Sequence, residues 1–558
     1  MTTYGFLPDN CAWFGVHSQE GFQMVDQAAQ NDDVQGSVPG MNPRQSSPQQ
    51  PVNPTHSARE PRPSDETLAA GRAAKRRQEK ALRERTGSSQ NSSRSALPNT
   101  CSPFCTVEEE QQAREQAIAD QMRLLRRELP QLLKKLAKIP DPRNPRKCRH
   151  RLTVLLLYGL LMFVFQFSSR RDANREMTRP QFEANLKLLF PELETMPHAD
   201  TLYRLLCDID LTHFEDAHIA VIQHLISSRK FRRYLIGKCY PIAIDGSQKI
   251  SRDWLFDEQA LQRIVGEEKI QYYVYILEAS LSFHNGMVIP LLSEFLEYKK
   301  GDSERDKQDC ELRAFQRLIE RLKSYFPGLP ALLLLDGLYA NGPVMQSCDK
   351  NHWQYMIVLK NKSLPSIWQE FHALLLRNPK NRRTHTWGNR NQCFSWVNDI
   401  EYEFTQNGHK YLLKVHVVLC EEKWQIVDKS GEIITQTARH AWLSSQPLNR
   451  GNVHERCNLG ARHRWGIEAG FLVEKHQGYY YEHAFALDWN AMKGYHLLMR
   501  MGHLFNTLAR FSRHMAELYC TLGVRPTIAY IRQTCSGPWL NADHIRAIFS
   551  RPFQLHLE

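Results

Sequence analysis

The stretch that organises the chain is ARHRWGIEAGFLVEKHQG, residues 461–478. In it Arg464, Glu468 and Lys475 are separated by four and then seven positions. Because each residue of an α-helix turns by about 100°, these spacings place the three ionic side chains along one stripe of a helix. A carboxylate between two bases suits a site in which the acid holds a metal ion and the bases hold phosphates. For a single helix taken alone, an ordinary solvent-facing charged surface is the alternative.

Length and composition set the scale of the molecule. A chain of 558 residues is too long for one compact core and predicts three or four structural units. The apolar content of 42% is sufficient for globular domains. A net charge of +12 and a pI near 9.0 favour an acidic polymer as partner, nucleic acid before a membrane surface.

Cysteine usage and the apolar runs point to the cytoplasm. The 13 cysteines include no CxxC pair, so we expect reduced thiols and neither disulfides nor a zinc site. The longest apolar run, residues 152–167, is shorter than the roughly 20 residues of a membrane span, and we expect a buried core helix. The start of the chain lacks a basic patch followed by an apolar run, which predicts no signal peptide.

Two units precede the part of the chain that carries the acids. Residues 1–105 are polar and basic, rich in Pro, Ser, Gln and Asn, and are predicted to form a disordered tail. Within this tail the run KRRQEKALRER, residues 75–85, is either a DNA-contacting arm or a transient solvated helix. Residues 106–235 are predicted to form an all-α unit that ends in the basic run RKFRR, residues 229–233. This unit either binds DNA and assists assembly or packs beside the next domain.

The helices of this unit have local start and stop signals. Thr106 and Glu109 form a capping-box pattern, which predicts a helix that begins at this point and ends near Pro130. A second short helix is predicted over 131–139, followed by the buried helix over 152–167. The segments LYRLLCDIDL and FEDAHIAVIQHLISSRKF are amphipathic and predicted to be helical.

At Cys239 the pattern changes to short apolar strands. CYPIAID predicts a strand that ends at Asp245, with Gly246 turning the chain, and QYYVYILEASLSF and MVIPLLSEFLEY predict two strands joined by a hairpin at 284–286. A helix over 302–326, the strand ALLLLDG, a helix over 343–349 and the strand YMIVLK follow. The predicted fold is therefore α/β with a mixed sheet.

The remaining domain boundaries follow from the predicted order of helices and strands. Residues 236–382 form the first part of the predicted α/β domain, and 383–448 contain further strands in a β-rich insertion. Residues 449–515 hold the organising helix and a long amphipathic helix over 491–513 that complete the domain. Residues 516–558 are assigned only as a C-terminal tail.

Two aspartates follow apolar strands. Asp245 and Asp336 each stand at the end of such a strand and are each followed by glycine. Because sites in α/β proteins are built where strands end, these carboxylates are expected side by side, and a divalent cation is the usual remedy for their repulsion. Oxygen-only ligands favour Mg²⁺ or Mn²⁺, and two ions about 3.5–4 Å apart can activate a water and stabilise a leaving oxygen. A simple Asp-Gly turn is the alternative for either residue alone.

The order of elements is similar to the ribonuclease H-like fold. The set Asp245, Asp336 and Glu468 resembles the DDE triad of cut-and-paste insertion-sequence transposases. Tyr339, in LDGLYANG, resembles part of the second-aspartate motif of that family. The segments IPDPRNPRKCRHRLTVLLLYGLL and MPHADTLYRLL resemble the helical region that precedes the nuclease domain in related transposases. The resemblance covers roughly residues 130–515.

The organising stretch carries the most specific part of this resemblance. RHRWGIEAGFLVEK resembles the Y-x2-R-x3-E-x6-K signature of one large group of bacterial members, with Arg464, Glu468 and Lys475 at its last three positions. Ala461 stands where the signature has tyrosine, so the role of that tyrosine does not carry over. Glu474 is a competing third acid, but it lies about 120° around the helix from Glu468, away from the face of the two bases.

The long interval between the second and third acids also fits the family. The 132 positions from Asp336 to Glu468 exceed what one helical crossover requires, and strands over 383–448 resemble the β-rich insertion of this group. Such insertions lie beside the cleaved DNA end, and some supply an aromatic residue that receives a flipped base. Trp442 is the candidate for that role, and a tryptophan that only packs is the alternative.

The resemblance implies a bacterial transposase that acts in the cytoplasm, at the nucleoid when bound to DNA. It would hydrolyse a phosphodiester at transposon ends with Mg²⁺ or Mn²⁺, two ions, and join the freed 3′-hydroxyl to target DNA. Its partners would be double-stranded DNA and a second copy of the chain, with no small-molecule cofactor and no membrane. Arg464, Lys475, Trp442 and Tyr339 would contact DNA. A ribonuclease H-like nuclease without strand transfer and an inactive DNA-binding regulator are the alternatives.

Overall fold

The computed structural model describes Arg77 and residues 101–266, 269–298, 310–428 and 431–558. Apart from Arg77 and residues 101–105, the predicted disordered tail lies outside the described residues, as do residues 302–309 of the helix predicted over 302–326. The described chain divides into a smaller unit, which includes residues 386–392 and 422–438, and a larger unit that includes all the candidate site residues. The larger unit is described by itself below.

The first helix, α2 (Val107–Leu136), begins where the sequence predicts. The Thr106 hydroxyl accepts a hydrogen bond from the Glu109 backbone N–H at 3.1 Å. In return the Glu109 carboxylate accepts one from the backbone N–H of Cys105 at 2.8 Å, one residue earlier than in the standard capping box. These bonds satisfy N–H groups at the start of the helix that have no partner within it.

The predicted helix end at Pro130 is wrong. Helix α2 continues through the proline to Leu136 as one element. A proline inside a helix removes one backbone hydrogen bond and costs about 3 kcal/mol. Here Leu129 and Leu132, on either side of it, are fully buried, and burial of such side chains contributes about 1.5–3 kcal/mol each. Packing against the bundle therefore offsets the local preference of the proline.

The other helices of the N-terminal region follow in quick succession. The apolar run predicted to be a buried helix forms α3 (Leu152–Val164), in which all residues except Thr153 are buried. The remaining helices are α4 (Arg170–Met177), α5 (Pro180–Leu189), α6 (Ala199–Asp208) and α7 (Leu211–Ser227). No helix of the described residues is both long and apolar enough to cross a membrane.

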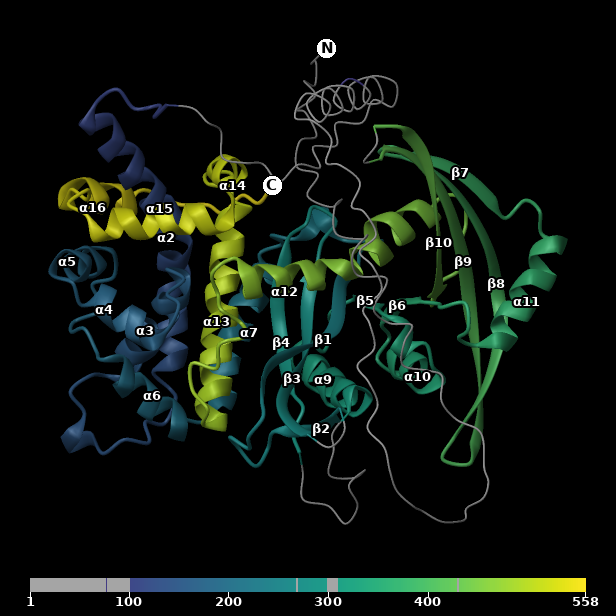
Figure 1. The fold of residues 1–558 in the computed structure, drawn as a ribbon, viewed down its shortest axis with the longest axis horizontal. Coiled ribbons are helices and arrows are strands. Elements are labelled where there is room, and N and C mark those ends of the chain that lie inside the picture. The colour runs from purple at the N-terminus through teal and green to yellow at the C-terminus, as the bar shows by residue number, and fades with distance from the viewer. Residues whose placement is uncertain (1–76, 78–100, 267–268, 299–309, 429–430) are drawn as a thin grey trace, which may run out of the picture. The chain divides into compact units, whose positions relative to one another are not determined.

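Helices from the end of the chain complete this bundle. The long helix α13 (Trp489–Arg510) packs against α3 and α6. The predicted C-terminal tail, residues 516–558, contains three helices: α14 (Ala516–Leu522), α15 (Val524–Ser536) and α16 (Ala542–Ser550). Figure 1 shows α15 and α16, in yellow, lying beside the purple α2, which they contact. Segments from both ends of the sequence thus share one helical body.

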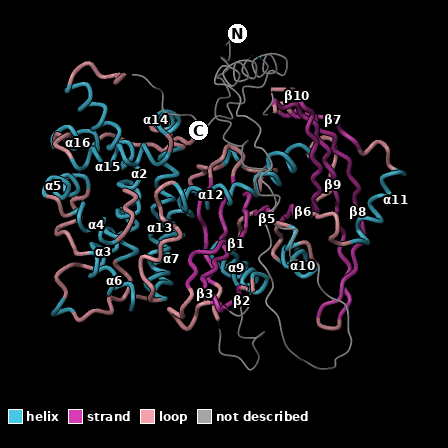
Figure 2. Tube along the Cα trace, viewed as in Figure 1, coloured by secondary structure: helices cyan, strands magenta, loops and turns pink. Residues whose placement is uncertain are grey.

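One mixed sheet runs through the rest of the chain. In the described residues its strands follow the order β2-β3-β1-β5-β6-β10-β9-β8-β7, with β4 paired to β3. The strands are β1 (Tyr240–Arg252), β2 (Leu261–Val265), β3 (Lys269–Ser282), β4 (Val288–Phe295), β5 (Ala331–Leu335), β6 (Gln354–Val358), β7 (Arg382–Trp387), β8 (Arg390–Gln406), β9 (His409–Val427) and β10 (Ile433–Ser444). They are magenta in Figure 2.

The pairing of these strands has two parts. Strand β1 pairs antiparallel with β3, which pairs antiparallel with β4, whereas β1, β5 and β6 are parallel neighbours. Helix α9 (Glu311–Tyr325) connects β4 to β5, and α10 (Gly342–Lys350) connects β5 to β6. Strand β10 then pairs antiparallel with β6. The predicted mixed α/β fold, preceded by a helical region, is confirmed.

Strand β5 is buried on both faces, as predicted for ALLLLDG. Leu333 and Leu335 belong to the main core, and Leu332 and Leu334 belong to a second core on the other face. The organising stretch, expected as one helix, forms a 3₁₀ helix (Ala461–Trp465) that carries Arg464, followed by α12 (Gly466–His476), and both contribute to that second core.

Strand β1 differs from its predicted extent. It continues through Asp245 and Gly246 to Arg252, so the predicted strand end and turn at Gly246 are wrong. Gly246 is paired with Leu277 of β3, and a Cβ on it would collide with the ring of Tyr275. The glycine therefore allows close approach of an aromatic ring and does not turn the chain.

The predicted hairpin between β3 and β4 is confirmed. Gly286 has a φ of +85°, a conformation that glycine adopts without strain. The backbone N–H of Phe283 donates to the carbonyl of Met287 at 3.0 Å and closes the turn.

Candidate active site

Asp245 and Asp336 lie at the same edge of the sheet. Strands β1 and β5 are parallel, and their last paired residues are Ala243 and Leu334. Each aspartate lies two residues beyond that pair, which places the two at the same level on neighbouring chains. Glu468 belongs to the first turn of α12, which packs against β1. The fold therefore brings together three acids that are far apart in sequence.

Arg464 lies between two of these acids. Its Nη1 donates to Asp245 Oδ2 at 3.1 Å, and its Nη2 donates to Glu468 Oε1 at 2.7 Å. The residue is only 8% exposed, and its Nε has no hydrogen-bond partner. In this arrangement the guanidinium faces the acids and holds them close together.

The carboxyl of Asp245 is sensitive to its neighbours. Burial raises its pKa, the nearby charges of Glu468 and Asp336 raise it further, and Arg464 opposes them, so that the pKa is about 6. The effect of two other acids on this pKa indicates that the three share one negative site. A site of this kind attracts a cation.

Asp336 is oriented by its own turn. Its Oδ1 accepts a hydrogen bond from the Leu338 N–H at 2.8 Å, at the start of the short 3₁₀ helix Gly337–Tyr339. Its Oδ2 lies 3.9 Å from Nζ of Lys360. Lys360 follows β6, the strand beside β5, so the rule that selected the aspartates from the ends of neighbouring strands would also have selected this lysine. The sequence analysis missed it.

The donor set suits a hard divalent ion. Asp245, Asp336 and Glu468 offer carboxylate oxygens, the ligands that Mg²⁺ and Mn²⁺ prefer. With Arg464 bound to two of them, no group of three or more His, Cys, Asp or Glu side chains in the described residues is close enough to hold an ion. A shared ion therefore requires the guanidinium to move or the acids to close around it. The chemistry of the ligands fits such an ion, whereas their spacing in this structure does not hold one.

Lys475 lies on the last turn of α12 and does not reach the acids. Its Nζ is 3.2 Å from a carboxylate oxygen of Glu482 and 5.7 Å from the centre of the Tyr481 ring. Its side chain is 21% exposed. The expected stripe of Arg464, Glu468 and Lys475 therefore has its first two members in contact and its third bound elsewhere.

The two aromatic candidates are buried. Trp442 of β10 is 4% exposed, stacks on His440 at 5.7 Å and lies 5.8 Å from the guanidinium of Arg462. These contacts agree with the alternative of a packing tryptophan. Tyr339 is fully buried, and its hydroxyl donates to Glu311 at 2.7 Å. Neither side chain presents a free surface to a base in this structure.

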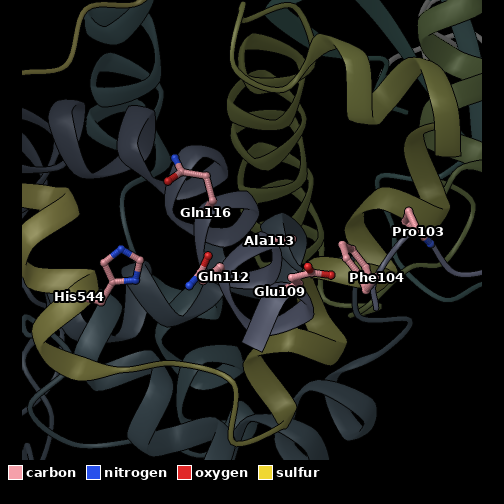
Figure 3. A pocket seen from close by; sticks show the side chains of 7 residues that line it. All are labelled: Pro103, Phe104, Glu109, Gln112, Ala113, Gln116 and His544. Atoms are coloured by element: carbon pink, nitrogen blue, oxygen red, sulfur yellow. The ribbon is translucent and has the colours of Figure 1, made fainter. Parts of the chain in front are cut away.

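A polar hollow elsewhere in the fold does not contain the acids. It has a volume of about 830 Å³, and Figure 3 shows its lining, which includes Glu109 and Gln116 of α2 and His544 of α16. It lies in the helical body, so the candidate active site is defined by the converging acids at the sheet edge.

Residues 133–222 match a family model described as DDE_Tnp_1-associated. No protein in the curated set matches the chain. The matched residues run from the last part of α2 through α7 and include none of the three acids. The match indicates a relation to DDE-type transposases through the helical region and suggests a transposase-related function.

Proposed function

We propose that this chain, with its transposase-associated helical region, is a DDE transposase that cuts and joins DNA with divalent metal ions. The observation that carries the proposal is the convergence of Asp245, Asp336 and Glu468 at one site, with Arg464 between two of them. This set was selected from the sequence as the DDE triad and the signature arginine. The family match is independent support, because it rests on other residues.

A ribonuclease H-like catalytic domain is part of this proposal. The sheet order β4-β3-β1-β5-β6, with three antiparallel strands followed by two parallel to β1, supports it. Asp245 on β1 and Asp336 after the parallel neighbour β5 support it further, because the two acids lie at the same edge of this sheet.

In the proposed mechanism Asp245, Asp336 and Glu468 would hold the metal. When bound, Mg²⁺ or Mn²⁺ supplies an activated water or hydroxyl and stabilises the leaving oxygen of the phosphodiester. Asp245 has to lose its proton to serve as a ligand, and Arg464 favours its ionised form. The Leu338 N–H fixes the carboxylate of Asp336 before any ion arrives.

The DNA would be held by cations around and beyond this site. Arg464 and Lys475 are proposed to contact the backbone, with Lys475 exchanging its Glu482 partner for a phosphate. A groove of about 410 Å³ between α7 and the end of the chain adds a second cationic surface. Arg229, Lys230, Arg233 and Arg513 line it, together with one acid, Glu558. Such a surface suits the phosphates of a duplex.

Cleavage and joining of a DNA fragment that carries the element's own ends test the proposal. The ends are taken from the DNA that flanks the gene, where the proposal expects inverted repeats. With Mn²⁺ or Mg²⁺ we expect a nick that frees a 3′-hydroxyl, followed by strand-transfer products in a dimeric protein–DNA complex. Asp245→Asn, Asp336→Asn and Glu468→Gln should each abolish cleavage and leave DNA binding intact, because the ligand charge is lost. Asp253→Asn removes an exposed carboxylate paired with Lys269 and is the matched control.

Three outcomes separate the proposal from its alternatives. Cutting without joined products would identify a nuclease of similar fold. DNA binding without any metal-dependent cutting would identify a regulator. Near-normal cleavage by Glu468→Gln would remove Glu468 from the site.

A further inference from the structure

A cluster of buried ionic side chains joins α12 to the sheet and to α13. Glu474 of α12 and Glu278 of β3 are both fully buried. Arg500 of α13 reaches both of them, with Nη1 at 3.0 Å from Glu474 Oε1 and Nη2 at 3.0 Å from Glu278 Oε2. One guanidinium therefore ties together two helices and a strand.

Two buried histidines extend the cluster. His503 Nδ1 lies 2.7 Å from Glu474 Oε1, and His496 Nε2 lies 2.9 Å from Glu278 Oε1. Burial alone would raise the pKa of Glu474, but Arg500 and His503 lower it to about 2. Glu474 is therefore ionised at neutral pH and is held by charge as well as by geometry.

Stability alone gives no reason for this arrangement. Removing ions from water costs several kcal/mol each, and well-packed apolar side chains in place of a buried ionic group are often neutral or stabilising. A guanidinium that bridges two carboxylates instead fixes direction, because its donors lie in one plane at set angles. Apolar contacts of equal area would let a helix rotate or slide more freely.

In the described residues, the other contacts that hold helix α12 include two ion pairs, Glu468 with Arg464 and Lys475 with Glu482, each with one exposed partner. Ile467 and Phe471 are its buried large apolar side chains. Gly466 and Gly470 face Ser282 and Val288, and a Cβ on Gly466 would collide with Ser282. On that side the helix lies close to the sheet without a side chain to lock it.

We propose that Glu474, held by Arg500, is a positioning residue that sets the rotation of α12 and thereby aims Glu468 at Asp245. This inference rests on the proposed function, in which Glu468 is the third acid. Glu474 lies six residues after Glu468, about 9 Å along the axis and about 120° around it. It therefore acts from another face of the helix and does not touch the reacting groups.

The position of Glu468 is sensitive to small rotations of α12, which Glu474 restrains. A side-chain tip lies about 5–6 Å from the helix axis, so rotation of α12 by about 20° would move Glu468 by about 2 Å. Catalytic groups tolerate displacements of about 0.5 Å, and a misplacement of about 1 Å can cost about 100-fold in rate. Small freedom in α12 is thus enough to weaken a shared metal site.

The test compares Glu474→Gln with a matched control, Glu128→Gln. Glu128 is also a buried glutamate bonded to a histidine, His224 at 2.9 Å, but it lies between α2 and α7. The full chain is used for both variants. The first measurement is hydrogen exchange of the α12 amides without metal, and the second is the Mn²⁺ concentration that gives half-maximal DNA cleavage.

We expect Glu474→Gln to raise α12 exchange and the Mn²⁺ requirement at least about tenfold, and Glu128→Gln to change neither. If Glu474→Gln does not fold, His503→Leu removes one of the two partners of Glu474 and should shift both quantities in the same direction. Unchanged exchange in the folded variant would overturn the inference. Faster exchange with an unchanged Mn²⁺ requirement would also overturn it, because α12 would then be braced without Glu468 being aimed.

Failure of the proposed function gives a different result. In that case the wild-type chain shows no Mn²⁺-dependent cleavage at all. The exchange measurement still decides whether Glu474 holds α12, since it needs neither metal nor DNA.

Discussion

Replacing Asp245 by asparagine should stabilise the metal-free protein at neutral and alkaline pH. The pKa of Asp245 is raised from 3.8 to about 6 by burial and by the charges of Glu468 and Asp336. A folded-state pKa above the unfolded value means that the folded chain holds the proton more tightly. The wild type therefore loses stability as the pH rises from about 4 through about 6, and the amide, which does not titrate, avoids this loss.

The size of the effect follows from the shift. Each pKa unit corresponds to about 1.4 kcal/mol, so a shift of about two units gives about 2–3 kcal/mol between pH 4 and pH 8. The carboxyl side chain is 23% exposed, so solvent screens it only in part. Urea unfolding in EDTA at a series of pH values measures the difference between Asp245→Asn and the wild type.

Bound metal should make the wild type more stable than Asp245→Asn. Mn²⁺ at about 1,000 times its Kd would stabilise the wild type by about 4.1 kcal/mol and leave Asp245→Asn nearly unchanged. Asp253→Asn, at an exposed ion pair, should follow the wild type in both conditions. Superimposable pH profiles for Asp245→Asn and the wild type would refute the reasoning, because they would mean that burial and the neighbouring acids do not raise the pKa of Asp245.

Three further outcomes are expected. Lys475→Met should flatten the salt dependence of DNA-end binding by about one unit and hardly change stability, whereas a drop in melting temperature with an unchanged slope would mean that Lys475 only braces Glu482. The double variant Arg229→Gln/Arg233→Gln should flatten the same slope by up to about two units for specific and unrelated duplexes alike, and a change for one sequence only would argue against phosphate contacts. A chain that starts at Cys101 should still cut a pre-bound end, and a folded but inactive product would show that the first hundred residues take part in the chemistry.

Local sequence patterns predicted most of the helices and strands. The apolar run of α3, the amphipathic stretches of α6 and α7, and the sequence His284-Asn285-Gly286 at the β3–β4 turn all predicted the structure that forms. These features depend on neighbours within a few positions, so side-chain period and backbone preference are sufficient to predict them. The same local rule, acids at strand ends, selected Asp245 and Asp336 although the first lies within a longer strand.

Local preference failed where packing opposed it. Pro130 predicts a helix end, and buried leucines on both sides carry α2 through it. Gly246 predicts a turn, and a neighbouring strand that lays Tyr275 over it keeps β1 extended. In both cases the contacts that decide the outcome come from other elements.

The sequence by itself determined which residues are candidates for the site: Asp245, Asp336, Arg464 and Glu468 were all selected by type and spacing. Tertiary structure alone decided how their side chains interact, because the hydrogen bond of Arg464 to Asp245 joins residues 219 positions apart. It also decided that Glu474 is a buried anchor held by Arg500, an interaction that no helical spacing predicts. The physical reason is that burial and charge pairing between elements depend on how the elements pack. Periodicity in the sequence indicates only which residues lie on the same face of one helix or strand.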